Sequence, residues 1–381
     1  MADIVIKNGK VLDPLLGVFE RKDVAIQNGR IASVSSRIEE DAVIVLDARD
    51  CIVSPGLIDF HVHVNREGSE HGIDGDLGLL PNGVTTAVDG GTCGVSNYRA
   101  FHNTTIVHSL LRLKSLINVS STGLMSTLYD ENVDPRFFDL DKLKLKRLFE
   151  EFSGEIVGLK LRTSKQIVGN MTSEPLEGAL KIAEQMGCPL VVHVTNPSID
   201  CGLIAKMLRP GDVFCHAYQG RNNTILDESG KVKSEVLQAH DRGVLFDACN
   251  GTWNYAFSVA KPAMEQGFLP DIISTDLSWS SFYKQPVISL PYVMSKYWNM
   301  GMQLTDIFDR TVLNPAKYLH MEQELATLQP GTVADVAIFR EVKQHAVFYD
   351  CINEMLEGDR ILVPQATIKG GKMMYRQTNF I

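Results

Sequence analysis

Six ionisable residues in five short apolar segments have side chains that can hold a metal ion. They are His61, His63, Lys160, His193, His216 and Asp276. His61 and His63 are two residues apart, so a β-strand places both imidazoles on one face. Taken singly, a strand histidine is usually a packed core residue, and an aspartate such as Asp276 is usually a helix cap. Six such groups facing one interior would be buried without partners, and a metal centre removes that cost.

Eight apolar segments, which start about 30 residues apart, are predicted to be the β-strands that position these residues. The segments are 56–64, 85–91, 115–124, 156–162, 189–195, 212–217, 244–248 and 271–276. Helices are predicted between them at 139–152, 175–186, 201–208, 233–241 and 257–266. Eight strand–helix units of about 30 residues close a parallel barrel, whose chemistry takes place at the C-terminal strand ends. We therefore expect the six residues to meet there.

The two ends of the chain are predicted to form a small β domain together. Short β-branched runs occur at 3–7, 22–27, 30–34 and 43–46, and again at 333–339, 366–369 and 372–376. Turn dipeptides such as Asn8-Gly9 and Asn28-Gly29 separate several of these runs. The predicted fold class is α/β, with a (β/α)8 TIM barrel over 56–328 and a small β-sandwich domain formed by 1–55 and 329–381.

The composition argues against several kinds of partner. Hydrophobic residues make up 44% and charged residues 22% of the 381 residues, as in ordinary globular proteins. The net charge of −9 comes without a block of Lys and Arg, which argues against nucleic-acid and anionic-membrane partners. The longest uncharged run has 15 residues, whereas a membrane-spanning helix needs about 20. We expect a small-molecule substrate, and the sequence leaves a homo-oligomer open.

The N-terminus and the cysteines favour a cytoplasmic protein. Asp3 and Lys7 stand where a signal peptide needs apolar residues. The seven cysteines are scattered and include no CxxC pair, which fits reduced thiols better than a disulfide framework.

Several motifs resemble the amidohydrolase superfamily. The segment VSPGLIDFHVH (53–63) is followed by a strand lysine, two strand histidines and an aspartate in the last strand, in the order typical of that superfamily. The late segment LQPGTVADVAIF (328–339) is similar to the β-sandwich of those enzymes. GLKLRTS (158–164), LRPGDVFCHAYQG (208–220) and GFLPDIISTDL (267–277) resemble the amidohydrolase/deacetylase, or dihydroorotase-like, branch.

The resemblance implies a site with two divalent metal ions, with zinc as the first choice and manganese or cobalt as further options. It assigns one ion to His61, His63 and Asp276, and the other to His193 and His216. It also implies that carbon dioxide converts Lys160 to a carbamate, which bridges the two ions together with a hydroxide. In this scheme Asp276 takes the proton of the attacking hydroxide and delivers it to the leaving group.

Candidate substrate contacts are predicted in the loops that follow the strands. They are Arg66, Arg162, Tyr218, Asn222, Asn223 and Asn250. Arg66 lies further along the chain from the histidine pair than the arginine of the dihydroorotases, and Arg162 shares the strand face of Lys160. Asn250 stands where the branch has a histidine in Asp-x-Gly-His-Gly, and Cys249 stands at its first glycine. Cys93 matches a metal-ligand position of D-aminoacylases, although a small buried thiol is the simpler expectation.

The function expected from these residues is a metal-dependent, deacetylase-type hydrolase. It would cleave an amide or ester acyl group from a small carboxylate-bearing substrate. The alternatives are a cyclic amidohydrolase similar to dihydroorotase or hydantoinase, an enzyme similar to adenine deaminase, and a noncatalytic scaffold homologue. All six predicted ligand positions are intact, which argues against the scaffold.

Overall fold

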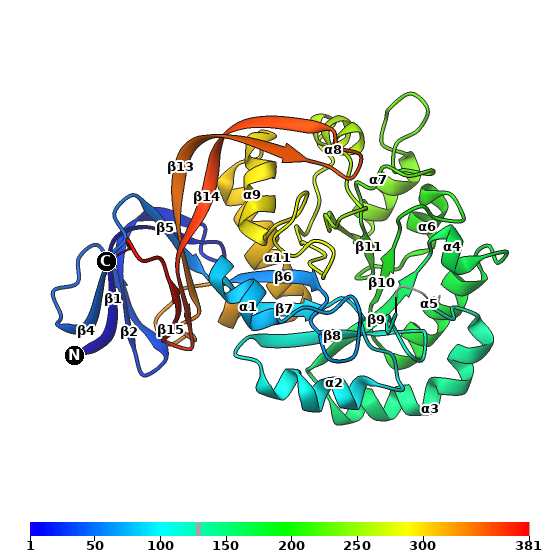
Figure 1. Ribbon diagram of the computed structural model, residues 1–381, viewed down its shortest axis with the longest axis horizontal. Helices are drawn as coiled ribbons and strands as arrows, with labels where there is room; N and C mark the ends of the chain where they lie inside the picture. Colours follow the sequence, from blue (N-terminus) through cyan, green and yellow to red (C-terminus); the bar gives the residue numbers. More distant parts are fainter. Residues whose placement is uncertain (127–130, 381) are drawn as a thin grey trace.

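In the computed structural model, which describes residues 1–126 and 131–380, a curled parallel sheet of seven strands forms the centre of the molecule (Figure 1). In sheet order its strands are β12 (Leu245–Asp247), β11 (Val213–Cys215), β10 (Leu190–His193), β9 (Ile156–Arg162), β8 (Arg112–Asn118), β7 (Val84–Asp89) and β6 (Leu57–Val62). Every neighbouring pair is parallel. The first seven predicted strands are therefore confirmed, with shifts of a few residues at their ends.

The eighth predicted strand, 271–276, does not form a regular strand. It makes one parallel bridge to β12, between Asp247 and Ile272, and one to β6, between Val62 and Leu277. The segment thus contacts both edge strands of the sheet. Its backbone N–H groups are partly bonded outside the backbone ladder of the sheet, those of Ile273 to the Arg310 carbonyl and of Thr275 to Asp59 Oδ1, and Asp276, with a φ of 53°, turns the chain out of the extended conformation.

The helices follow the strands and cover the outer face of the sheet (Figure 1). The longer ones are α3 (Pro135–Glu151), α5 (Glu174–Met186), α7 (Ser234–Asp241), α8 (Phe257–Glu265) and α9 (Leu290–Asn299). The shorter ones are α1 (Gly75–Leu79), α2 (Tyr98–Thr104), α4 (Lys165–Val168), α6 (Cys201–Met207), α10 (Leu304–Phe308), α11 (Asn314–Tyr318) and α12 (Glu322–Leu325). All five helices predicted from the sequence are present.

Helix α5 shows why these segments are helical. Pro175 lies in its first turn, where no backbone N–H is needed, and Gly187 ends it with a φ of 65°. Its buried residues, which include Leu176, Ala179 and Ile182, recur at the helical spacing and pack against the sheet.

Both ends of the chain contribute to a second, mixed sheet of eight strands. They are β1 (Ala2–Asp13), β2 (Val18–Gln27), β3 (Arg30–Ser35), β4 (Ala42–Asp47), β5 (Cys51–Pro55), β13 (Val336–Tyr349), β14 (Met355–Lys369) and β15 (Lys372–Arg376). Antiparallel pairing of β5 with β13 joins the two parts. Asn28 and Gly29 form the β2–β3 turn with positive φ values of 52° and 76°, which suit a tight hairpin.

Strands β13 and β14 extend much further than the sequence predicts. In Figure 1 they curve away from the second sheet and over α9. Backbone groups of β14 are held by α9: Asn299 Nδ2 donates to the Arg360 carbonyl at 2.8 Å, and the Leu362 N–H donates to Ser295 Oγ at 2.9 Å. The extension is largely exposed and lacks regular apolar alternation, so the sequence pattern does not mark it.

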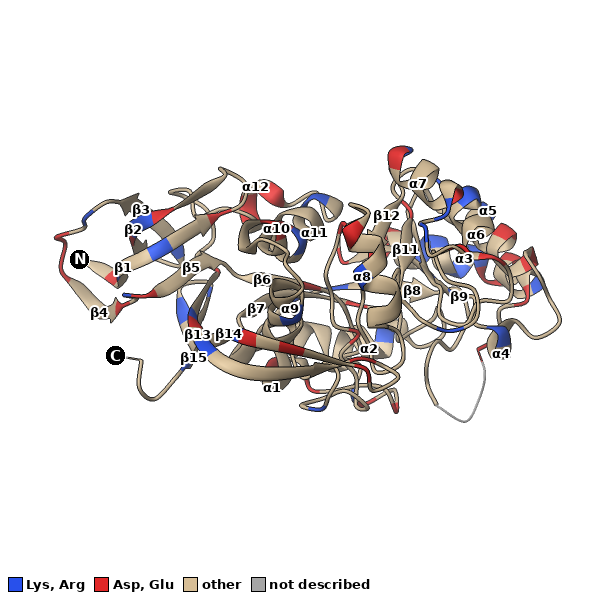
Figure 2. Ribbon diagram, turned by 90° about the horizontal axis from the view of Figure 1, so that it is seen from above, with Lys and Arg blue, Asp and Glu red and all other residues tan. Residues whose placement is uncertain are grey.

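Charged residues of both signs are interspersed over the two sheets and their helices (Figure 2). Within the described ranges, no helix combines the length and the apolar character that crossing a bilayer requires.

Lys296 of α9 is a fully buried cation next to the end of β12. Its Nζ donates to Asn250 Oδ1 at 3.3 Å and to the Pro286 carbonyl at 3.1 Å, and lies 4.8 Å from the centre of the Tyr255 ring. Burial lowers the pKa of Lys296 to about 7.

We expect Lys296→Met to change the pH dependence of stability. Lysine in the unfolded chain titrates near pH ~10.4, so between pH ~7 and ~10 the unfolded chain binds more protons than the folded one, and the stability of the wild type rises with pH. Relative to the variant, the wild-type unfolding free energy should gain up to about 1.4 kcal/mol per pH unit in this window. Denaturant unfolding at several pH values measures the effect. Exposed Lys146→Met is the control, and parallel curves for wild type and Lys296→Met would contradict the lowered pKa.

Candidate metal centre and active site

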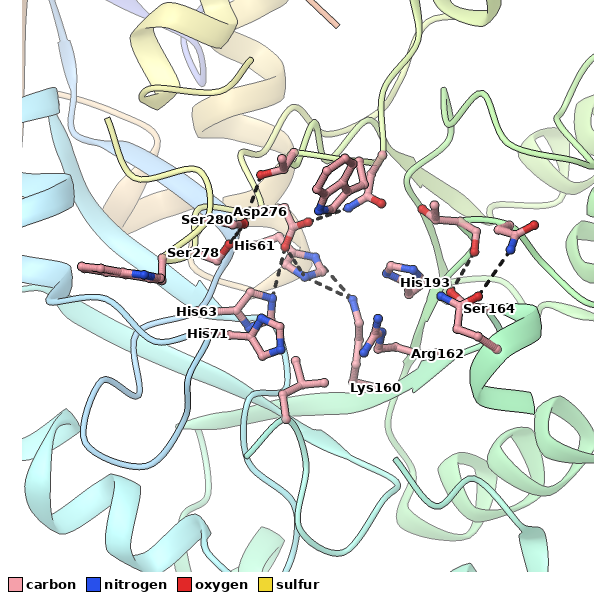
Figure 3. A pocket seen from close by; sticks show the side chains of 18 of the residues that line it. His61, His63, His71, Lys160, Arg162, Ser164, His193, Asp276, Ser278 and Ser280 are labelled. Atoms are coloured by element: carbon pink, nitrogen blue, oxygen red, sulfur yellow. Dashed lines mark hydrogen bonds and ion pairs between the residues drawn. The ribbon is translucent and has the colours of Figure 1, made fainter. Parts of the chain in front are cut away.

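A cavity of about 440 Å³ opens at the C-terminal ends of the parallel strands. Five of the six predicted residues line it, namely His61, His63, Lys160, His193 and Asp276, and Figure 3 shows their side chains converging. His216 is fully buried immediately behind them, with its ring 4.4 Å from that of His193. The structure therefore brings together residues that are up to 215 positions apart in the chain.

His61, His63 and Asp276 form one group of possible ligands. His63 Nε2 lies 3.1 Å and His61 Nε2 lies 3.8 Å from Asp276 Oδ1. One ligand atom from each of the three residues lies within 4.8 Å of the others. Burial, followed by the neighbouring Lys160, lowers the pKa of His61 to about 4, so its imidazole is neutral at pH 7 and keeps a lone pair for a cation.

A hydrogen-bonded chain sets the tautomer of His63. Thr92 Oγ1 donates to Asp89 Oδ2 at 2.8 Å and therefore accepts from His63 Nδ1, also at 2.8 Å. With the proton on Nδ1, the Nε2 lone pair faces Asp276 Oδ1. Two acceptors at this distance repel unless a proton or a metal cation lies between them, so the donor set fits a metal ion.

His193 and His216 form the second group. His216 Nδ1 donates to the Cys249 carbonyl at 2.8 Å, which leaves its Nε2 as an acceptor. That atom is buried and has no hydrogen-bond partner among residues 1–126 and 131–380. Burial, and then the nearby His216, holds the pKa of His193 well below its usual value, so His193 is also neutral. A buried, unpartnered imidazole nitrogen fits a metal ligand.

Lys160 lies between the two groups. Its Nζ is 3.2 Å from Nε2 and 3.4 Å from Nδ1 of His61, and the side chain is only 2% exposed. In the described part of the chain, no carboxylate lies within ion-pairing distance of its Nζ. A buried ammonium without a carboxylate partner is costly.

The backbone around the site is unusual. His216 and Asp276 have φ values of 67° and 53°, in the left-handed region that non-glycine residues rarely adopt. A Cβ on Gly90 would lie 2.3 Å from His61 Nε2, and one on Gly251 would lie 2.5 Å from Asp276 Oδ2. Only glycine leaves room for these two side chains to point into the site.

We expect Thr92→Val to weaken metal binding. The change removes the hydroxyl that orients His63 Nδ1, and loss of such an outer partner typically lowers metal affinity by about 10- to 100-fold. Competition with a zinc chelator measures the affinity, with Thr104→Val on the exposed side of α2 as the control. Equal zinc affinities of the two variants would contradict the role of Thr92.

The structure places the two candidate arginines differently. Arg162 lines the cavity, but its Nη1 already donates to Oε1 of the buried Glu131 at 2.5 Å. Arg66 is exposed, lies 3.9 Å from Asp74, and borders a separate hollow. The position of Arg66 therefore does not support the predicted substrate contact.

The other four candidate substrate residues are not among the residues that line the cavity. Their side chains instead bond within the fold: Tyr218 to the Phe268 carbonyl, Asn250 to Lys296, and Asn222 and Asn223 to the carbonyls of Pro197 and Ile199. Tyr218 and Asn250 are fully buried. Cys93 is a buried thiol that accepts from Asn65 Nδ2 at 2.9 Å, and burial raises its pKa, as expected of a packed cysteine.

Sequence reasoning missed the other residues that line the cavity, among them His71, Arg221, Trp253 and Trp279. They lie in loops after different strands, where no periodic pattern marks them. Burial, and then the adjacent His63, lowers the pKa of His71 to about 4. The only available signal was their position shortly after a predicted strand of the barrel.

Comparison with known proteins places the chain in a class. No protein-family model matches it. A deacetylase of Agrobacterium fabrum is 30% identical over 349 residues, which cover 91% of this chain and 84% of the relative. A solved structure of a dihydroorotase has a TM-score of 0.90 at 29% identity and covers 99% of this chain and 98% of its own. One of an adenine deaminase has a TM-score of 0.89 at 29% identity and covers 99% of this chain and all of its own.

The fold, the assembled side chains and these relatives agree on a hydrolytic enzyme. The chain belongs to the amidohydrolase superfamily, as its motifs predicted.

Proposed function

We propose that the protein is a metal-dependent hydrolase of the deacetylase type, which removes an acyl group from a small carboxylate-bearing amide or ester. The observation that carries the proposal is the convergence of four imidazoles, one aspartate and one buried lysine at and immediately behind a single cavity. The two bridges of segment 271–277 support a closed (β/α)8 barrel over 56–328. Residues 1–55 and 329–381 would form the small domain.

The donor set supports two divalent ions. His61, His63 and Asp276 would hold one, and His193 and His216 the other. Imidazole and carboxylate donors suit zinc. Lys160, carboxylated by carbon dioxide, would supply anionic oxygens to both groups, which also removes the unpaired buried ammonium. When bound, the ions would activate water at neutral pH and polarise the carbonyl that is attacked.

Asp276 would be the residue that moves the proton. Burial raises the pKa of Asp276, but the adjacent His63 and His61 more than offset this effect, so the carboxyl is ionised at pH 7. Its Oδ2 accepts from Asn254 Nδ2 at 2.7 Å, which fixes the carboxylate plane. Asp276 would accept a proton from the attacking water and release it to the departing nitrogen or oxygen.

The expected setting is the cytoplasm, with no nucleic-acid or membrane partner. The scattered cysteines, all free in the structure, and the net charge of −9 support this expectation.

A substrate screen tests the proposed function. The zinc-loaded enzyme, prepared with bicarbonate, is assayed against N-acetyl amino acids, O-acetyl hydroxy acids, dihydroorotate, hydantoins and adenine. We expect release of acetate from members of the first two groups. The likeness to a dihydroorotase and an adenine deaminase makes ring opening and ammonia release the competing results. Activity confined to ring opening or to ammonia release would overturn the deacetylase proposal.

A further inference from the structure

We propose that Arg221 binds the carboxylate of the substrate and so makes the enzyme selective for anionic acyl compounds. The inference rests on the proposed hydrolase function and assigns to one residue the recognition of charge. It replaces Arg66 and Arg162 in that role, because the first lies outside the cavity and the second is already paired with Glu131.

Arg221 is a cation at the cavity wall without a counter-ion. It is an exposed residue whose side chain lines the cavity, and over the described ranges its guanidinium forms no ion pair with a carboxylate. Instead, the guanidinium carbon lies 5.3 Å from the centre of the Trp253 ring, which also lines the cavity. An aromatic face orients a guanidinium but leaves its N–H groups free in the plane, where they can bind a carboxylate through two bonds.

The loop that carries Arg221 is fixed before any substrate binds. Gln219 is only 1% exposed, and its Oε1 accepts from the backbone N–H groups of Arg221 at 2.8 Å and Asn196 at 3.3 Å. Asn222 and Asn223, which the sequence suggested as substrate contacts, instead donate to carbonyls in the neighbouring loop. Their bonds hold the loop in place and so present Arg221 to the cavity. This pre-organisation lowers the entropic cost of binding.

The remaining charges of the cavity leave Arg221 as the anchor. Asp276 is anionic and repels a carboxylate, Arg162 is neutralised by Glu131, and Lys160 belongs to the proposed metal centre. A substrate held by its carboxylate at Arg221 therefore keeps its anionic end away from Asp276 and leaves its acyl group free to approach it.

Binding to an inert enzyme tests the proposal independently of turnover. The background is zinc-loaded Asp276→Asn, and the probes are N-acetylphenylalanine and its neutral carboxamide, since Trp253 and Trp279 offer apolar surface at the rim. Adding Arg221→Met to this background should weaken binding of N-acetylphenylalanine by about 10- to 100-fold. It should leave binding of the neutral carboxamide unchanged. Arg221→Lys should restore part of the difference. In the otherwise wild-type enzyme, Arg221→Met should raise KM for the carboxylate more than it lowers kcat.

Two further variants separate charge recognition from other effects. Arg147→Met, an exposed arginine of α3, is the matched control and should change neither affinity. Equal losses on both probes, or loss of selectivity in Arg162→Met instead, would overturn the role of Arg221. If the screen shows no deacetylation but Arg221 still discriminates the two probes, the proposed function fails and the anion site stands. If the screen shows release of acetate but Arg221→Met weakens binding of neither probe selectively, the proposed function stands and the role of Arg221 fails.

Discussion

Replacing Asp276 by asparagine should lower kcat by about 10²- to 10⁴-fold, the range expected when a general acid–base group is removed. The amide cannot accept a proton from the attacking water. The amide has nearly the same shape as the carboxylate, whose Oδ1 lies 3.1 Å from His63 Nε2 and whose Oδ2 accepts from Asn254 Nδ2 at 2.7 Å, and its oxygen can occupy one of these two positions. The change therefore removes the proton carrier while keeping the shape of the site.

Two measurements separate this role from metal loss. Elemental analysis should find the same metal content in Asp276→Asn and the wild type, while steady-state assays find the loss in kcat. Asp241→Asn, at the exposed end of α7, is the control for the same chemical change and should have normal activity. An Asp276→Asn enzyme that retains its metal and at least a tenth of the wild-type rate would remove Asp276 from the mechanism.

The residues that were foreseen from the sequence are those that strands position. His61, His63, Lys160, His193 and His216 lie in or next to buried strands, where an alternating side-chain direction predicts which residues face the interior. Asp276 was also identified, but its segment was expected to be a strand. No pattern of residue types reveals a left-handed φ at an aspartate, because that conformation is imposed by the packing around it.

The walls of the cavity were not foreseen in the same way. Arg66 and Arg221 are similar as sequence features, since each is an arginine shortly after a strand that carries histidines. Only the folded chain shows that one faces Asp74 outside the cavity and the other lies over Trp253 inside it. The pairing of Arg162 with Glu131 likewise joins residues 31 positions apart that no local periodicity connects.

Replacing Lys160 should have the second large effect, because the lysine lies between both groups of ligands. Its Nζ is 3.2 Å from His61 Nε2, and the side chain is buried. Lys160→Ala removes the atom that carbon dioxide would modify. If a carbamate supplies oxygens to the metal ions, the loss of several kcal/mol of transition-state stabilisation lowers kcat/KM by about 10³-fold. Lys165→Ala, at the exposed start of α4, should leave the rate unchanged.

Experiments with bicarbonate and with acetate test whether Lys160 acts as a carbamate. Metal-free wild type should take up zinc more completely with ¹³C-bicarbonate than in carbon-dioxide-free buffer, and should then show a carbamate resonance that Lys160→Ala lacks. Acetate supplies a carboxylate of its own, and the cavity left by the lysine side chain has room for it. Acetate should therefore restore part of the rate of Lys160→Ala but none of the rate of Asp276→Asn, whose defect is the missing proton acceptor. Equal zinc uptake with and without bicarbonate, and no response of Lys160→Ala to acetate, would show that Lys160 acts as an ordinary amine.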